Sequence, residues 1–152
     1  MKHLLFNLIF AIAFNSILFA KADPNMLKLR FEQISSAQGL SQSEVKAICQ
    51  DQNGFIWIGT LNGLNKYDGY DIIVYKNNVL DSTSISINYI NTIHNDKHGN
   101  LWVGTSNGLN LFNEKTGSFI RYLYNNEEPG LKPEIVVNRI IEIENGDLLV
   151  GT

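Results

Sequence analysis

The sequence has 152 residues, which is long enough for one ordinary domain, and a formal net charge of −3. Hydrophobic residues make up 44% and charged residues 18%, which argues against a disordered chain. The single cysteine excludes an internal disulfide framework and a cysteine-based zinc site, and three histidines argue against a histidine-rich metal centre. Because no basic stripe is present, we expect no nucleic-acid partner, and we expect no metal or other cofactor.

The first 22 residues have the three parts of a secretory signal. Lys2 opens a short basic start, residues 4–19 are mostly apolar, and residues 20–22 carry the small-x-small pattern that signal peptidase reads. The apolar stretch is shorter than the roughly 20 residues that a spanning helix needs. We therefore expect cleavage after Ala22 and an exported mature chain without a membrane span, with an uncleaved anchor as the alternative.

The rest of the chain is an internal repeat. Residues 90–109 repeat the pattern of residues 45–64 at an offset of 45, and a third, partial copy starts at Val137 with an offset of 47. We expect a lead-in over 23–44 with an extra strand at Leu27–Ile34, and repeats over 45–89, 90–136 and 137–152. The recurring positions are Asp51, Gly54, Trp57, Gly59, Thr60, Gly63 and Leu64, then Asp96, Gly99, Trp102, Gly104, Thr105, Gly108 and Leu109, then Gly146, Gly151 and Thr152.

Each full copy predicts four short strands separated by turns. The predicted strands are Val45–Gln50, Phe55–Thr60, Leu64–Tyr67 and Ile72–Tyr75, followed by Ile90–Asn95, Leu101–Thr105, Leu109–Phe112 and Phe119–Tyr124. Four antiparallel strands in about 45 residues are typical of a β-propeller blade. We therefore expect an all-β fold, a partial β-propeller of two complete blades and part of a third. The strand glycines Gly59, Gly104 and Gly151 indicate a close approach of backbones.

One repeat position is filled in turn by Cys49, His94 and Ile141. A catalytic or metal-binding position does not alternate in this way, whereas a packing position does. We therefore interpret Cys49 and His94 as structural residues, and we expect His98 to face solvent in a turn.

The repeated Asp51 and Asp96 fit either calcium binding or the capping of a hairpin turn. The further acidic ligands of a calcium loop are missing, so we favour the turn. The repeated Trp57 and Trp102 fit either stacking on sugars or packing between blades, and their mid-strand positions favour packing.

The signature Asp-x-x-Gly-x-x-Trp-Ile/Val-Gly-Thr-x-x-Gly-Leu-x-x-Tyr/Phe resembles the two-component regulator propeller repeat. The lead-in from Phe31 through Gly39 to Val45, and the connector Asp81–Ser86, resemble the start of the periplasmic sensor region of hybrid two-component regulators from Bacteroidetes-type bacteria. The resemblance covers about residues 27–152. It implies a parent protein, anchored in the inner membrane, that detects a carbohydrate in the periplasm and signals through a histidine kinase to transcription. No ligand-contacting residue follows from it.

Regulators of this kind are much longer than this chain. The resemblance implies a double propeller, a small β-sandwich, a membrane helix, a histidine kinase, a receiver and a DNA-binding helical domain. A propeller closes with roughly four to eight blades, whereas this chain supplies two and part of a third, so we expect a truncated sensor. Because none of the catalytic parts is in this chain, we expect that it is not itself an enzyme. Its expected partners are an oligosaccharide in the parent, and missing blades or copies of itself. Because the extra strand would lack its partner, we expect the isolated chain 23–152 to be poorly soluble or to self-associate.

Two other functions are left open by the sequence. The first is a fragment of a secreted propeller enzyme, such as a sialidase or a polysaccharide lyase. Sialidase chemistry needs an arginine cluster, whereas the mature chain has only Arg30, Arg121 and Arg139, in unequal contexts. The second is a self-assembling interaction module, in which several chains together close a ring.

Overall fold

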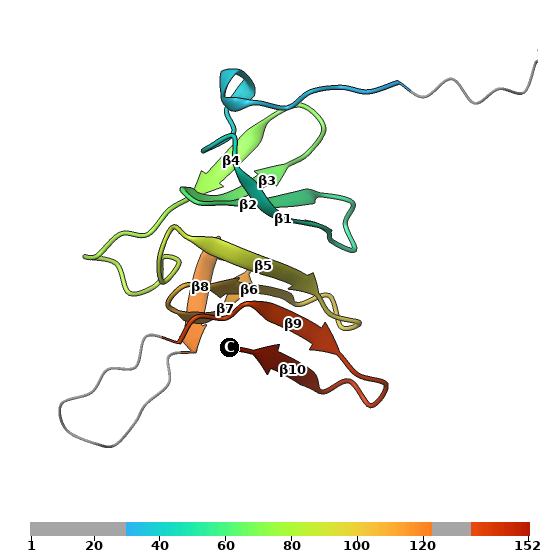
Figure 1. Cartoon of the computed structure of the whole chain (residues 1–152), viewed down its shortest axis with the longest axis vertical. Coiled ribbons are helices and arrows are strands. Elements are labelled where there is room, and N and C mark those ends of the chain that lie inside the picture. The colour runs from blue at the N-terminus through green and yellow to red at the C-terminus, as the bar shows by residue number, and fades with distance from the viewer. Residues whose placement is uncertain (1–29, 123–134) are drawn as a thin grey trace, which may run out of the picture. The chain divides into compact units, whose positions relative to one another are not determined.

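The computed structural model describes residues 30–122 and 135–152 (Figure 1). The expected signal peptide over 1–22 lies outside these residues. The chain divides into two compact units, 1–32 and 33–152. In the first unit Arg30 and Glu32 form an exposed salt bridge of 2.9 Å. The second unit contains all of the strands that the structure describes.

Two four-stranded antiparallel sheets follow each other along the chain. The first has the order β1 (Val45–Gln50), β2 (Ile56–Thr60), β3 (Gly63–Tyr67) and β4 (Ile72–Tyr75). The second has the order β5 (Ile90–Asn95), β6 (Leu101–Thr105), β7 (Gly108–Asn113) and β8 (Ser118–Tyr122). A two-stranded sheet of β9 (Arg139–Glu142) and β10 (Leu148–Gly151) comes third. A short 3-10 helix, η1 (Ser36–Gln38), precedes β1.

The two complete sheets repeat each other in register. Cys49 pairs with Trp57 in the first sheet, and His94 pairs with Trp102 in the second. Each sheet also has a register shift near the start of its first strand, between Val45 and Ala47 and between Ile90 and Thr92. The all-β fold and the four-stranded antiparallel blades of a partial β-propeller are therefore confirmed.

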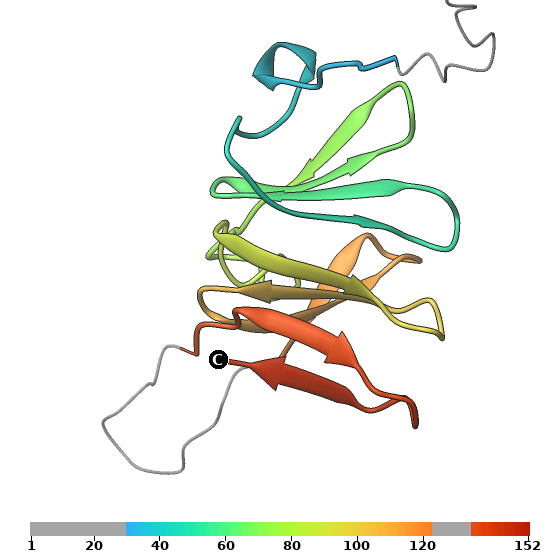
Figure 2. The same ribbon diagram turned by 45° about the vertical axis from the view of Figure 1, so that its right-hand side comes forward.

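The three sheets stack one after another in chain order (Figures 1 and 2). Their first strands make the joints, because β1 packs on β5 and β5 packs on β9. Buried apolar side chains fill the space between the first two sheets, as sandwiched sheets require. This core cluster consists of Trp57, Leu64, Ile85, Ile90, Ile93, Leu101, Val103 and Phe119.

The described part of one expected strand has no regular secondary structure. Residues 30–34 have no regular secondary structure, although we expected an extra strand at Leu27–Ile34. A strand needs a neighbouring edge for its backbone hydrogen bonds. Residues 33 and 34, which belong to the second unit, pair with none of the described strands.

Candidate functional site

The turn between β1 and β2 is organised by the Asp51 carboxylate. Its Oδ1 accepts hydrogen bonds from the backbone N–H groups of Asn53 and Phe55, both at 3.0 Å. Its Oδ2 accepts a 2.7 Å hydrogen bond from the indole Nε1 of Trp57. Gly54 closes the turn with φ +89°, a conformation that favours glycine.

The turn between β5 and β6 is built in the same way around Asp96. The backbone N–H groups of His98 and Asn100 donate to Oδ1, and Trp102 Nε1 donates to Oδ2 at 2.9 Å. Burial alone would raise the pKa of Asp96, but the hydrogen bonds from Trp102, Asn100 and His98 outweigh it and leave the pKa below its ordinary value. The carboxylate is therefore a structural acceptor in this turn.

The tryptophans lie at the joints between sheets. Trp57 is 1% exposed, and its ring packs against Tyr75 at 5.8 Å and Phe112 at 4.8 Å between ring centroids. Trp102 is half-buried, 5.7 Å from the ring of Tyr122. Because the Trp57 ring has almost no accessible face, it is not available for stacking on a sugar.

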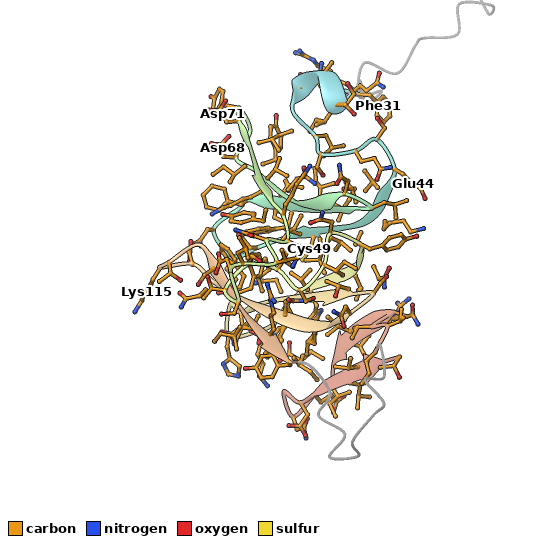
Figure 3. The ribbon with its side chains drawn as sticks, turned by 90° about the vertical axis from the view of Figure 1, so that its left-hand side faces the viewer. Phe31, Glu44, Cys49, Asp68, Asp71 and Lys115 are labelled. Atoms are coloured by element: carbon orange, nitrogen blue, oxygen red, sulfur yellow. The ribbon has the colours of Figure 1, made fainter. Side chains whose placement is uncertain are left out.

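Cys49 and His94 occupy equivalent places at successive joints. Cys49 is half-buried against the core cluster (Figure 3), and burial raises the pKa of its thiol above the ordinary value. His94 Nε2 lies 3.8 Å from Glu142 Oε2 across the joint between β5 and β9. His98 is exposed in the β5–β6 turn. Within the described residues, no group of three or more His, Cys, Asp or Glu side chains is placed to hold a metal ion.

The strand glycines permit the first joints to close. A Cβ added to Gly59 would lie 2.5 Å from Ile90 Cγ2, and one added to Gly104 would lie 2.5 Å from both Thr92 Cγ2 and Val137 Cγ1. The close approach that we expected is therefore present at these two positions. At Gly151 the nearest atom would be 3.8 Å away, because no described sheet packs against that position.

A buried polar network connects the segment before β1 to the first sheet, and the segment before β5 to the second sheet. This network was not predicted from the sequence. The backbone N–H of Ser41 donates to Asn65 Oδ1 at 2.8 Å, and that of Ser86 donates to Asn110 Oδ1 at 2.9 Å. Both asparagines are fully buried. The signal was present, since each pair recurs at the offset of 45 residues.

A cavity of about 250 Å³ lies between the turns of the first two repeats. We call it the turn pocket, and its lining residues are Asp51, Gln52, Asn53, Trp57, His98, Gly99, Leu101, Phe112 and Glu114. Asn53 Nδ2 donates to Glu114 Oε1 at 3.2 Å, which links the two repeats across the pocket. A polar rim over an apolar floor suits a small hydroxylated ligand.

A second cavity, of about 310 Å³, lies near the outer strands β4 and β8. Its charged lining groups are Lys76 and Asp81. The hydrogen bonds from Thr83 to the exposed Asp81 carboxylate keep its pKa below the ordinary value.

No helix in the described residues is long and apolar enough to span a membrane.

These repeated sheets and turns define two propeller repeats and the start of a third. Residues 39–62 and 84–107 match the sequence family described as two component regulator propeller. Each match begins in the lead-in, at Gly39 and Ser84, and so includes the serine that bonds the buried asparagine.

Solved structures with the same fold are extracellular domains. That of the putative hybrid two component system BT3049 from B. thetaiotaomicron is 36% identical, with a TM-score of 0.70 over 80% of this chain and 17% of that chain. That of BT4673, from the same organism, is 28% identical, with a TM-score of 0.61 over 81% and 18% of the two chains.

A curated relative, histidine kinase P4 of Formosa agariphila, is 52% identical over 56 residues, which are 37% of this chain and 4% of that protein. This chain thus spans less than a fifth of each solved domain and a small part of the kinase. It resembles the propeller region at the extracellular side of hybrid two-component systems.

Proposed function

We propose that this chain is the N-terminal part of the periplasmic sensor region of a hybrid two-component regulator, whose parent detects a carbohydrate and signals to transcription. The observation that carries the proposal is the 36% identity, over 80% of this chain, to an extracellular domain of a putative hybrid two component system. The signal-like pattern of residues 1–22 supports export to the periplasm.

In this proposal the chain contributes ligand-facing surface and no catalysis, and the kinase belongs to another part of the parent. Further repeats of the parent cover the outer faces of the stack. On those faces the apolar side chains of Ile48 and Leu149 are 67% and 51% exposed, an unfavourable arrangement for a surface left open to water.

The proposal is tested in the source organism by transcription. A strain in which the codons for residues 39–152 are deleted in frame is grown on single polysaccharides, and its transcripts are compared with those of the parent strain. The expected result is the loss of induction of one set of glycan-uptake genes on one polysaccharide. Unchanged induction on every polysaccharide tested, or a tagged chain recovered only from the cytoplasm, would overturn the proposal.

A further inference from the structure

We propose that the turn pocket binds one ring of a neutral sugar. The inference rests on the proposed carbohydrate-sensing function, and it adds the place and the charge class of the ligand. The pocket is formed by the β1–β2 turn of one repeat and by the β5–β6 and β7–β8 turns of the next. Its volume of about 250 Å³ lies just below the roughly 300–1,000 Å³ of sites for drug-sized ligands, which suits a single ring.

The walls of the pocket are held in place before any ligand arrives. Asp51 fixes its turn through the bonds to Asn53, Phe55 and Trp57. Gln52 Nε2 reaches across to the backbone carbonyls of Asp96 and Lys97, at 3.4 and 3.3 Å. A ligand therefore does not have to order these groups, which lowers the entropic cost of binding.

The rim offers both acceptors and donors. The Glu114 carboxylate receives one hydrogen bond from Asn53 within the described structure and keeps further lone pairs for a ligand. Asn53 and His98 are also among the lining residues and bring an amide and an imidazole side chain. A hydroxyl group both donates and accepts, so it matches such a mixed rim, while the half-buried Phe112 provides apolar surface for the C–H face of a ring.

The charges of the pocket select against acidic sugars. Asp51 and Glu114 bring carboxylates to it, and no lysine or arginine is among its lining residues. Lys115, at the tip of the β7–β8 turn, projects outward (Figure 3) and is exposed. A uronate or sulfate group would meet like charge at short range, whereas the ammonium of Lys66 lies over the rings of Phe55 and Trp57, 3.7 and 5.4 Å from their centroids. A neutral ring meets no such repulsion.

The chain contains two tryptophans, which makes a direct test possible. Trp57 lines the pocket and Trp102 does not, so their indole N–H signals report binding inside and outside it. The full chain, labelled with ¹⁵N, is titrated with neutral cello-, xylo- and manno-oligosaccharides and with acidic oligogalacturonate and chondroitin sulfate fragments. We expect a neutral oligosaccharide to shift the Trp57 signal and to leave that of Trp102 in place.

Two matched variants assign the effect to the rim. Glu114→Ala is expected to weaken binding about tenfold or more, because it removes a charged acceptor. Glu144→Ala removes the same group from an exposed site in the β9–β10 turn and is expected to leave affinity unchanged. Asn53→Ala serves as a second pocket variant, and a dispersed spectrum verifies that each variant is folded.

The outcomes separate this inference from the proposed function. If no neutral oligosaccharide shifts Trp57, or only acidic ones do, the inference is overturned. Binding that is insensitive to both Glu114→Ala and Asn53→Ala also overturns it. In each of these cases the transcription experiment still decides whether the parent senses carbohydrate, because it does not depend on where the ligand binds.

Discussion

Trp57 Nε1 donates a 2.7 Å hydrogen bond to Asp51 Oδ2, and the equivalent bond from Trp102 to Asp96 measures 2.9 Å. This bond explains why the aspartate and the tryptophan recur six residues apart in both complete repeats. In the third repeat the two positions are Ile143 and Leu149, so donor and acceptor are absent together. A buried indole N–H without an acceptor, or a carboxylate without its donors, is thereby avoided.

Removal of the Asp51 carboxylate should destabilise the fold. Asp51→Ala leaves the buried indole N–H of Trp57 and two turn N–H groups without their acceptor, and we expect a loss of about 2 kcal/mol in the free energy of unfolding. Urea unfolding followed by tryptophan fluorescence measures it. Asp71→Ala, at an exposed side chain, is the control and should change stability by less than about 0.5 kcal/mol. Equal effects of the two variants would refute this account of the turn.

Stability should fall in acid partly through Asp96. Its pKa in the folded chain lies below the ordinary value of about 3.9, so the carboxylate stabilises the fold above about pH 4. That contribution is lost as the pH falls through the folded-state pKa. We expect Asp96→Asn to reduce the loss of stability between about pH 4 and pH 2, as measured by urea unfolding at each pH. An unchanged acid profile in the variant would contradict the lowered pKa.

A methyl group at Gly104 should crowd both the neighbouring strand β5 and the segment that leads into β9. The added Cβ would lie 2.5 Å from Thr92 Cγ2 and from Val137 Cγ1, so we expect Gly104→Ala to cost about 1–3 kcal/mol or more. Gly151→Ala is the matched control in the same repeat position, where the nearest atom would be 3.8 Å away, and should be close to neutral. Thermal unfolding compares the two, and similar melting temperatures would show that this joint tolerates the extra volume.

The buried amide of Asn110 should anchor the lead-in of the second repeat. Asn110→Ala removes the acceptor of the Ser86 N–H and the donor to the Val103 carbonyl, and we expect a cost of about 1–3 kcal/mol. Amide hydrogen exchange gives a local readout, because the Ser86 N–H should lose protection in the variant. Protection at Ser86 equal to that of the unmodified chain would show that the network is dispensable.

The thiol of Cys49 should react slowly while the chain is folded. Burial raises its pKa above the ordinary value, and the nearby Asp51 charge raises it further, although a hydrogen bond with the Asn95 backbone opposes both. The thiolate fraction at pH 8 is therefore reduced. Alkylation with iodoacetamide should be slower than in the urea-unfolded chain, and the single cysteine makes the mass shift unambiguous. Equal rates in the two states would show that the fold does not protect the thiol.

The strands were predictable because each repeat places short apolar runs between turns rich in Asp, Asn and Gly. Four of the observed strands, β1, β4, β5 and β6, have the bounds expected from the sequence. β2 starts one residue later than expected, and β7 extends one residue further at each end. These differences lie at strand ends, where the pattern specifies least.

The remaining features depend on contacts between segments that are far apart in the chain. The turn pocket brings Asn53 together with Glu114, 61 residues away, and no local pattern predicts that approach. Asn65 and Asn110 recur at the repeat offset, but their buried environment is created only when Ser41 and Ser86 fold back on the sheet. The expected strand at Leu27–Ile34 had suitable residues, but residues 30–34 have no regular secondary structure.

Backbone hydrogen bonds between each complete sheet and the connector that follows it also recur. Gly63 N donates to Asn88 O at 2.8 Å, and Gly108 N donates to Ile135 O at 2.7 Å. In each repeat the sheet thus provides the donor, and the connector that leads to the next sheet provides the acceptor. A tandem duplication of one such segment in the gene would copy both halves of the joint at once. The number of repeats can therefore change during evolution without a new contact surface between neighbouring repeats.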